Sequence, residues 1–384
     1  MLKRGKNPLK RLYTSNLLPG MIVGEDVFSF SNQLIIPRGL VLTDKMITRL
    51  EFYSIPHIKI KDSAEEPFDA PISHDDTVDG IRPAAVTPMH EPDRSYSDLI
   101  QSSPEFKKFK QDFDHTVDEF KSSVNDIVQK GAPVDTTALL HQATELMNGA
   151  SNNSDFFHML HNMRQYDDLT FAHCMNVALI SNILAGWLNM SEEDIETATL
   201  CGLLHDIGKL AIPDQIIKKP SKLTDEEYKI VKTHTIEGYN ILKDQNISVH
   251  IKNAALMHHE KCDGSGYPFG LAGNKIDPFA KIVAIADVYD AMTAARVYRG
   301  PLCPFQVIDI FEKEGLQKYE AAYILPFLEN VVMTYMNNRV RLSDGTEGDI
   351  VYINHAHLSR PMIKSEDRFI DLSIATELSI EQIL

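Results

Sequence analysis

Apolar residues at helical spacing dominate the middle of the chain. One such run lies between residues 96 and 150, where large side chains recur at intervals of three and four: Phe106, Phe109, Phe113, Val117 and Phe120. This interval places them on one face of a helix. Further on, residues 224–227 read Thr-Asp-Glu-Glu, the form of a capping box, which predicts that a helix begins there. Residues 151–339 are predicted to form a core of amphipathic helices.

The two ends of the chain show a different pattern. Short apolar runs of strand length occur at residues 21–23 and 34–36, and residues 58–61 alternate between Ile and Lys as in a strand. A short helix is predicted from Thr43 to Phe52. Residues 1–62 are therefore predicted to be a small mixed α/β domain. Residues 63–95 are rich in Asp, Glu, Pro and Ser, which is typical of a linker. Asp344-Gly345 is a hairpin-type turn followed by a β-branched and aromatic run, so residues 340–384 are predicted to be a short β-containing appendage.

The helical segment at residues 96–150 has two interpretations. Its apolar stripe can pack against neighbouring helices of the same chain. Alternatively, the segment can act as a stem that joins two copies in a homodimer or transmits a signal to the core. The pattern favours the first and leaves the second open. The prediction for the whole chain is a mainly α fold, with β structure at the two ends.

The amino-acid composition limits which classes of partner the chain is expected to bind. The net charge of −16 argues against a nucleic-acid polymer as partner, because such a surface needs clustered Lys and Arg. The longest apolar stretch, residues 177–188, is too short to span a bilayer, and no apolar signal segment follows the basic N-terminus. The four cysteines form no CxxC pair, which suits reduced thiols. We expect a cytoplasmic protein without a membrane span.

Histidines and aspartates are concentrated in predicted helices of the core. The set is His173, His205, Asp206, His234, His258, His259 and Asp287. On the single helix predicted to begin at Thr224, Ile230 shares one face with His234, and apolar neighbours also share the helical face of His258, so these imidazoles are predicted to point inward. A lone inward histidine is usually a hydrogen-bonded core residue, but five imidazoles cannot easily satisfy one another. Two divalent cations that share an aspartate can satisfy them, so a metal site is predicted.

The residue types also indicate the metal and the chemistry. Histidine with carboxylate suits transition metals better than Mg²⁺ or Ca²⁺, with Fe or Mn first and Ni, Co or Zn as alternatives. Without thiolate ligands, a structural zinc site is disfavoured. Two metals about 3.5–4 Å apart would clamp a phosphodiester and lower the pKa of a water between them. The pattern therefore predicts phosphoester hydrolysis.

Motifs around these residues resemble the HD-GYP family of the HD phosphohydrolase superfamily. The family's elements occur in its order and cover about half of the chain: His205-Asp206-Ile207-Gly208-Lys209, then His258-His259-Glu260, then Asp263-Gly264-Ser265-Gly266-Tyr267-Pro268, and last the block from Asp287 to Thr293 with Arg296 and Arg299.

The resemblance implies an all-helical, HD-type catalytic core at residues 151–339. It would hydrolyse cyclic di-GMP, a bacterial second messenger, to pGpG or GMP. Matched by motif position, the seven residues of the set would be metal ligands, with Asp206 bridging two ions and a hydroxide held between them. Lys209 would act with Asp206 in catalysis, neutralising phosphoryl charge or protonating the leaving oxygen. The substrate-binding residues would be Lys209, Tyr267, Asp290, Arg296 and Arg299, although Asp290 could instead orient a ligand.

One position departs from the family pattern. Some members bind a third metal through a Glu one helical turn before the first histidine, and here that position is Leu169. We therefore expect two metals, and the reaction could stop at pGpG.

Two other functions stay open. The first is a non-catalytic sensor of cyclic di-GMP, which the complete ligand set disfavours. The second is a phosphodiesterase for 3′,3′-cGAMP, whose metal site would look the same because it contacts phosphate and not base. Regulation is expected to come through the N-terminal domain, the helical segment or an unknown regulatory partner.

Overall fold

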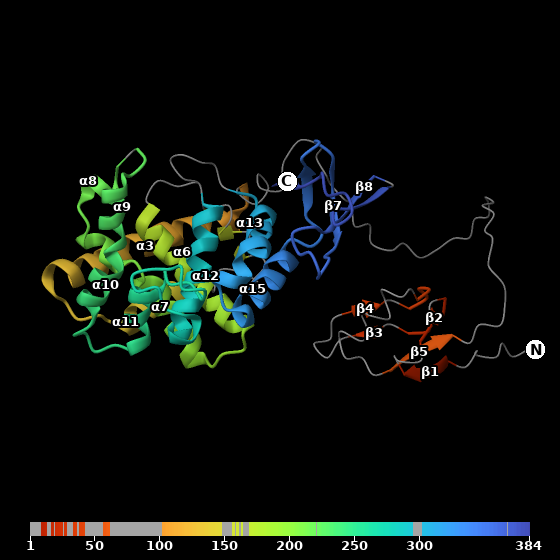
Figure 1. Cartoon of the computed structure of the whole chain (residues 1–384), viewed down its shortest axis with the longest axis horizontal. Helices are drawn as coiled ribbons and strands as arrows, with labels where there is room; N and C mark the ends of the chain where they lie inside the picture. The colour runs from red at the N-terminus through yellow and green to blue at the C-terminus, as the bar shows by residue number, and fades with distance from the viewer. Residues whose placement is uncertain are drawn as a thin grey trace, which may run out of the picture. The chain divides into compact units, whose positions relative to one another are not determined.

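The structure, a computed structural model, describes residues 9–13, 17–18, 20–25, 27–28, 34–36, 38–42, 57–61, 102–147, 156–157, 159–160, 163, 169–219, 221–294, 302–366 and 368–384. Contacts divide the chain into two compact units, Met1–Pro88 and Met89–Leu384. In the described residues the first unit is built from strands and the second mainly from helices (Figure 1). The prediction of a mainly α fold with β structure at both ends is confirmed.

The described part of the first unit contains two small antiparallel sheets. In one, β5 (His57–Lys61) lies between β1 (Leu9–Tyr13) and β2 (Ile22–Val23). In the other, β3 (Val27–Phe28) pairs with β4 (Leu34–Ile36). Alternation along β5 buries Ile58 and Ile60 in a small apolar core. Strands are therefore confirmed in all three predicted runs, whereas the helix predicted from Thr43 to Phe52 lies outside the described residues.

The second unit is a helical core followed by a sheet. Its helices are α3 (Pro104–Lys130), α4 (Thr136–Met147), α6 (Leu169–Trp187), α7 (Glu192–Leu204), α8 (Asp214–Ile217), α9 (Asp225–Lys232), α10 (His234–Leu242), α11 (Val249–Met257), α12 (Pro278–Thr293), α13 (Pro304–Ile310), α14 (Leu316–Lys318) and α15 (Ala321–Thr334). Between them lie the 3-10 turns η2 (Ile207–Ala211) and η3 (Gly273–Lys275) and the π-helical turn η4 (Phe311–Gly315). None of the described helices is both long and apolar enough to cross a membrane.

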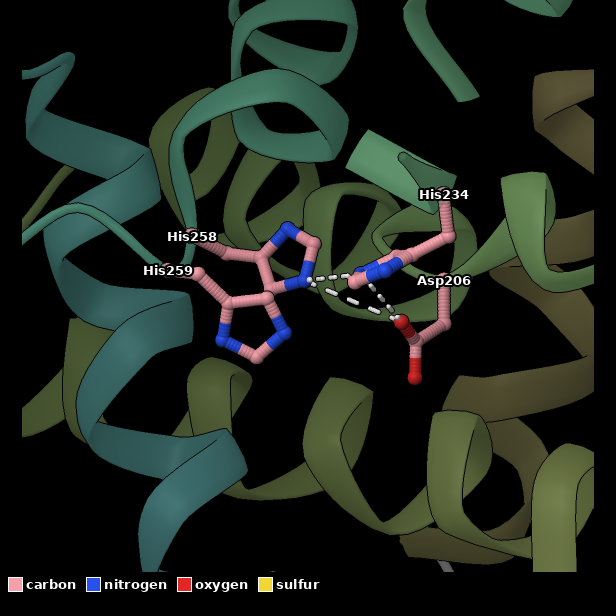
Figure 2. Close-up of side chains that lie close together, drawn as sticks. All are labelled: Asp206, His234, His258 and His259. Atoms are coloured by element: carbon pink, nitrogen blue, oxygen red, sulfur yellow. Dashed lines mark hydrogen bonds and ion pairs between the residues drawn. The ribbon is translucent and has the colours of Figure 1, made fainter. Parts of the chain in front are cut away.

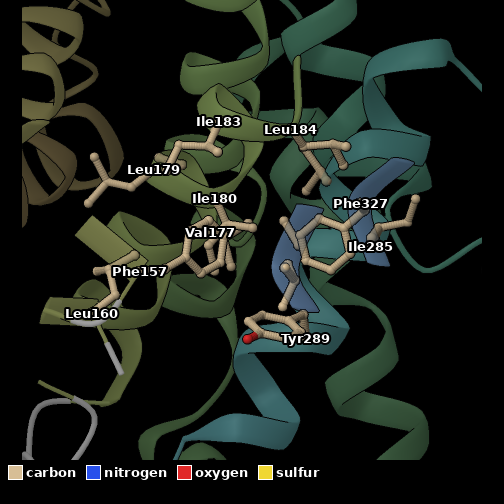
Figure 3. Close-up of a cluster of buried hydrophobic side chains, with 14 of the residues drawn as sticks. Phe157, Leu160, Val177, Leu179, Ile180, Ile183, Leu184, Ile285, Tyr289 and Phe327 are labelled. Carbon is tan, nitrogen blue, oxygen red and sulfur yellow. The ribbon is translucent and has the colours of Figure 1, made fainter. Parts of the chain in front are cut away.

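The centre of the second unit is formed by α6, α7 and α12. Val177 and Ile180 of α6 lie in one buried cluster with Ile285 and Tyr289 of α12 (Figure 3). The pairing of α6 with α7 depends on Gly202, because a Cβ there would lie only 2.5 Å from the Cα of Ala178. This close approach sets the C-terminal end of α7 directly against α6.

The apolar stripe of α3 is covered by the chain's own core. All five of its predicted residues are buried, and Phe109 and Phe120 make edge-on ring contacts with Phe156 and Phe171. Ser103 caps the helix by accepting a hydrogen bond from the Phe106 amide. Packing within the chain therefore accounts for the stripe, and a homodimer contact through α3 would have to use its exposed face.

The C-terminal residues form a five-stranded antiparallel sheet in the order β10-β6-β7-β8-β9. The strands are β6 (Arg339–Leu342), β7 (Glu347–Tyr352), β8 (Met362–Ser365), β9 (Arg368–Asp371) and β10 (Ile380–Ile383). The turn between β6 and β7 carries Asp344 and Gly345, as predicted. Val340, Leu342 and Ile350 belong to the same buried cluster as the helices, so the sheet continues the helical core.

The segment after the capping box differs from its prediction in two ways. Thr224 does form a capping box with Glu227, but the expected single helix is divided into α9 and α10 at Thr233. Ile230, which was predicted to share the inward face with His234, is 41% exposed. The break at Thr233 explains this, because it separates the helical faces of α9 and α10.

Candidate metal centre

The seven predicted ligands converge from five helices and the turns that follow them. His173 lies within α6 and Asp287 within α12, while the others lie at helix ends: His205 and Asp206 after α7, His234 at the start of α10, and His258 and His259 after α11. The prediction that each ligand lies on a helix is therefore wrong for the two doublets, which occupy turns.

Backbone carbonyls orient three of the histidines. The Nδ1 atoms of His205 and His234 each lie 2.7 Å from a carbonyl oxygen, that of Gly202 and that of Val231. His258 Nδ1 lies 2.9 Å from the carbonyl oxygen of Ala254. These carbonyls lie in the last turns of α7, α9 and α11, and that of Ala254 also accepts the backbone amide of His258 at 3.1 Å. With Nδ1–H donating to a carbonyl, each imidazole presents an unprotonated Nε2.

His173 is oriented by a side chain instead. Its Nδ1 lies 2.7 Å from Asp290 Oδ2, and its Nε2 lies 3.1 Å from Asp287 Oδ1. Asp290 is 1% exposed and comes from the same face of α12 as Asp287. Asp290 therefore contacts a predicted ligand, which supports the orienting role considered for it above over direct contact with substrate.

A close backbone approach brings His234 to the His205-Asp206 turn. Gly208 of η2 lies against the start of α10, and a Cβ on Gly208 would lie 1.9 Å from the carbonyl oxygen of His234 and 2.4 Å from the amide nitrogen of Gly238. Only a residue without a side chain fits there. The glycine of the His-Asp-Ile-Gly-Lys motif thus sets the separation between Asp206 and His234.

The ligand atoms form two groups beside Asp206. The first ligand set is His173, His205 and Asp287, and the second ligand set is His234, His258 and His259. The ligand atoms of the first set lie within 4.8 Å of one another. The ligand atoms of the second set and of Asp206 also lie within 4.8 Å of one another.

Asp206 faces both ligand sets. Its Oδ2 lies 3.2 Å from His205 Nε2 and 3.8 Å from His173 Nε2. Its Oδ1 lies 3.3 Å from His234 Nε2 and 3.7 Å from His258 Nε2 (Figure 2). The two oxygens of one carboxylate thus point to different sets of imidazoles, an arrangement that suits a carboxylate shared by two metals.

Burial and charge favour the protonation states that metal binding needs. Desolvation lowers the pKa of His234 and of His258, and it lowers the pKa of His259 to about 3. These imidazoles are therefore neutral near pH 7. Burial alone would raise the pKa of Asp206, but Lys209 and His205 outweigh it and hold that pKa well below its usual value.

His173 and Asp287 form a more strongly charged pair. Burial acts to lower the pKa of His173, but hydrogen bonds to Asp287 and Asp290 outweigh it and raise the pKa to about 9. Burial acts to raise the pKa of Asp287, but the hydrogen bond from His173 and the charge of that imidazolium outweigh it and hold the pKa well below its usual value. In the absence of another cation, His173 thus carries the compensating charge for these carboxylates.

Two buried atoms test whether a metal fits. Among the described residues, His205 Nε2 and Asp206 Oδ1 have no hydrogen-bond partner although both side chains are 1% exposed. A buried polar atom without a partner is costly. Both atoms point toward neighbouring ligand atoms, so a cation in each set would satisfy them. The chain therefore has a cluster of His and Asp residues that could bind metal.

One side of the cluster is open to solvent. The side chains of His205, Asp206, His234 and His258 are at most 1% exposed, whereas that of His259 is 22% exposed and that of Lys209 is 26% exposed. Lys209 forms an ion pair with Asp206 Oδ2. A substrate would approach from the side of Lys209 and His259.

The loop after His259 places Tyr267 at this open side. The Tyr267 ring lies 4.6 Å from the ring of His259 and 6.4 Å from that of His234. The loop is held by Glu260, which is 2% exposed and accepts hydrogen bonds from the amides of Phe269 and Leu271 at 2.7 and 2.8 Å. The third residue of His258-His259-Glu260 therefore braces the loop that carries Tyr267.

The remaining residues to consider are two predicted arginines and one cysteine that was not predicted. Arg296 and Arg299, predicted to bind substrate, lie outside the described residues. Cys174 was not predicted at the site, yet its thiol groups with His205 and Asp206. Burial raises the pKa of this thiol well above its usual value, so it is uncharged and a poor ligand. Its position inside α6, one residue after His173, is the signal that could have located it.

Comparisons with known proteins find similarity over the region that carries these residues. The family model described as "HD domain" matches residues 136–323. Cyclic di-GMP phosphodiesterase PA4108 of Pseudomonas aeruginosa is 32% identical over 236 residues, which are 61% of this chain and 56% of that protein. The 3′3′-cGAMP-specific phosphodiesterase 1 of Vibrio cholerae is 41% identical over 145 residues, 38% of this chain and 34% of that protein. The chain thus spans about half or less of these relatives.

A solved structure also aligns with the chain. Bd1817, described as an HDG"Y"P protein from Bdellovibrio bacteriovorus, gives a TM-score of 0.44 at 16% identity, over 84% of this chain and 99% of that one.

Proposed function

We propose that this chain is a metal-dependent phosphodiesterase that hydrolyses cyclic di-GMP, because its residues 136–323 match the family model described as "HD domain". The relatives named as phosphodiesterases for cyclic di-GMP and for 3′3′-cGAMP support a cyclic dinucleotide as the substrate class. The observation that carries the proposal is Asp206, whose two oxygens face different sets of imidazoles. One carboxylate shared in this way suits two cations side by side, the arrangement that stabilises both the attacking and the leaving oxygen of a phosphodiester.

The proposed cofactor is a pair of divalent transition-metal ions, Fe or Mn before Ni, Co or Zn. His173, His205 and Asp287 would hold one, His234, His258 and His259 would hold the other, and Asp206 would bridge them. When bound, the pair would polarise the phosphoryl oxygens and lower the pKa of an attacking water. Some family members bind a third metal through a Glu one helical turn before the first histidine. In this chain that position is Leu169, the first residue of α6, so two ions are proposed and not three.

The chain's own residues would divide the remaining work. Lys209 stays charged, because Asp206 raises its pKa against the opposing effect of burial. Its ammonium at the open side would neutralise the charge that develops on the phosphoryl oxygens. Asp290 would hold His173 in one orientation through Nδ1. Tyr267 would contact the nucleotide from its place beside His259. Arg296 and Arg299 would add phosphate contacts.

Reconstitution tests the proposal. Metal-stripped protein is loaded anaerobically with Mn²⁺ or Fe²⁺ and incubated with cyclic di-GMP, and the products are separated by chromatography. We expect pGpG or GMP from the wild-type chain and neither from the His205→Ala/Asp206→Ala variant. If the nucleotide binds but remains intact with every metal, the enzyme is excluded and a cyclic di-GMP sensor takes its place.

The similarity to a relative named as 3′3′-cGAMP-specific supports a second candidate substrate. The same reconstituted protein is given cyclic di-GMP and 3′,3′-cGAMP in competition. A higher kcat/KM for cyclic di-GMP is the expected result, and a clear preference for the mixed dinucleotide would replace the first substrate by the second without changing the chemistry.

A further inference from the structure

A lysine near the metal centre is held between two tyrosine rings. Lys232, the last residue of α9, places its Nζ 4.8 Å from the ring centroid of Tyr228 and 5.0 Å from that of Tyr267. Tyr228 is one helical turn earlier on α9, whereas Tyr267 comes from the loop braced by Glu260. Two ring faces attract the same ammonium group, so the lysine is fixed although its side chain is flexible.

Lys232 also differs from the lysines around it. Lys218 and Lys219 pair with Asp214 and Glu227 at 2.7 and 2.6 Å. Within the described part of the chain, no carboxylate oxygen lies within 4.0 Å of Lys232 Nζ. The side chain is half-buried, so its charge is partly removed from water without an anionic partner. A negatively charged ligand could bind this ammonium without first displacing a carboxylate.

The position of Lys232 connects it to the reacting groups. The Tyr267 ring that contacts the Lys232 ammonium also lies 4.6 Å from the ring of His259. Only one aromatic ring thus separates the lysine from the second ligand set. His259 is the more exposed member of that set, so Lys232 lies on the side from which a substrate would approach.

We infer that Lys232 binds the second phosphate of the cyclic dinucleotide, the one that is not held at Asp206. This inference rests on the proposed function. A cyclic dinucleotide carries two phosphodiester groups in one ring, and the two ligand sets with Lys209 can hold only the phosphate that reacts. The other phosphate remains negatively charged, and a cation at a fixed place beside the ligand sets would bind it in addition to the phosphate contacts proposed for Arg296 and Arg299. A lysine already ordered by two rings loses little freedom when it binds.

The test compares two substrates and three variants. Lys232→Met removes the charge but keeps an unbranched chain that fills the space between the rings. Lys232→Arg keeps the charge. Lys229→Met is the matched control, because Lys229 is an exposed lysine on the same helix. Each holoenzyme is assayed with cyclic di-GMP, which has two phosphates, and with bis(p-nitrophenyl) phosphate, which has one.

For Lys232→Met we expect the KM for cyclic di-GMP to rise about tenfold with little change in kcat, because a charge-assisted hydrogen bond is lost. Turnover of bis(p-nitrophenyl) phosphate should stay at the wild-type level, and Lys232→Arg should restore most of the lost affinity. The KM for cyclic di-GMP should also become less sensitive to salt than in the wild-type chain, since one screened ion pair is gone. Lys229→Met should match the wild-type chain throughout.

Three results would overturn the inference. Equal loss with both substrates would mean that Lys232 only supports Tyr267 and the ligand set behind it. An unchanged KM in Lys232→Met would mean that the lysine does not contact the nucleotide. A wild-type chain that cleaves bis(p-nitrophenyl) phosphate but not cyclic dinucleotides would overturn the proposed function itself. The assay of the wild-type chain alone distinguishes this outcome from the other two.

Discussion

Two kinds of histidine meet at the candidate metal centre, and they are held in different ways. His205, His234 and His258 follow or begin helices, and backbone carbonyls in the last turns of helices orient them. His173 lies inside α6, and a side chain from α12 orients it. The first arrangement depends on backbone geometry alone. The second depends on a residue that a single substitution can remove.

This difference indicates where the site tolerates change. Imidazoles held by backbone carbonyls keep their orientation as long as the helix ends stay in place, so they are sensitive to packing. His173 is sensitive to the chemistry of one carboxylate. Asp206 belongs to neither kind, because it joins both ligand sets.

The largest effect is expected from Asp206→Asn. Replacing the shared carboxylate by an amide removes a negatively charged ligand from both sets and leaves Lys209 without its partner. Turnover should fall roughly a thousandfold or more, and metal should be lost from both sets. Metal analysis and product chromatography on the same sample measure the two effects. Asp214→Asn, an exposed aspartate paired with Lys218, is the control and should change neither. Retention of about two metals by Asp206→Asn would exclude the shared role.

The next effect separates the two ligand sets. His258→Ala removes a ligand of the second set and His173→Ala one of the first. Each variant should retain about one metal per chain and lose roughly a hundredfold or more in turnover, because both ions of the proposed pair would take part in the proposed reaction. Metal analysis by mass spectrometry gives the stoichiometry. If both variants lose all metal, the two sets are one site, and the comparison between them fails.

A packing change should disturb only the helix-end histidines. Gly208→Ala puts a methyl group against the carbonyl of His234, so α10 must move. We expect a destabilisation of about 1–3 kcal/mol, typical of overpacking, together with weaker metal binding by the second set. Urea unfolding and metal titration measure these.

Gly186→Ala is the matched control for that change. It lies in α6 with no atom within 4 Å of the added Cβ, and it should stabilise the chain by about 0.5–1 kcal/mol. A Gly208→Ala variant as stable as this control would show that the close approach can be relieved at no cost.

The smallest effect is expected at the side-chain partner of His173. Asp290→Ala leaves every proposed ligand in place but removes the acceptor at Nδ1. Metal affinity and kcat should fall about 10–100-fold, the usual size for a residue that orients a ligand. Asp290→Asn should recover part of the loss, because its amide oxygen can still accept from Nδ1–H. An Asp290→Ala variant with full metal affinity would remove the distinction drawn here between His173 and the helix-end histidines.

The sequence predicts the parts of this molecule that depend on local pattern. The stripe of α3, the capping box at Thr224 and the strands at both ends follow from spacing and residue type, and the ligand set follows from motifs in a fixed order. The contact between His173 and Asp290 joins residues 117 positions apart, so no local pattern contains it. The break at Thr233 was missed because helical spacing continues across it, although the two helices point their faces differently.

The same limit applies around Tyr267. The Gly-Tyr-Pro segment marks a loop, but which side chains meet its tyrosine depends on how α9 and that loop pack together. Lys232 and Tyr228 look like ordinary residues of an amphipathic helix until the loop is in place. Long-range contacts of this kind need the folded chain.

Glu260 has a thermodynamic consequence. It ties the loop that carries Tyr267 to the chain directly after His259. A nucleotide that shifts this loop on binding must also shift a ligand of the second set, and an ion held by that set must restrict the loop. Affinity for the ion and affinity for the nucleotide would then share one coupling free energy, which has the same value in both directions. The concentration of either one in the cell would set how tightly the chain holds the other.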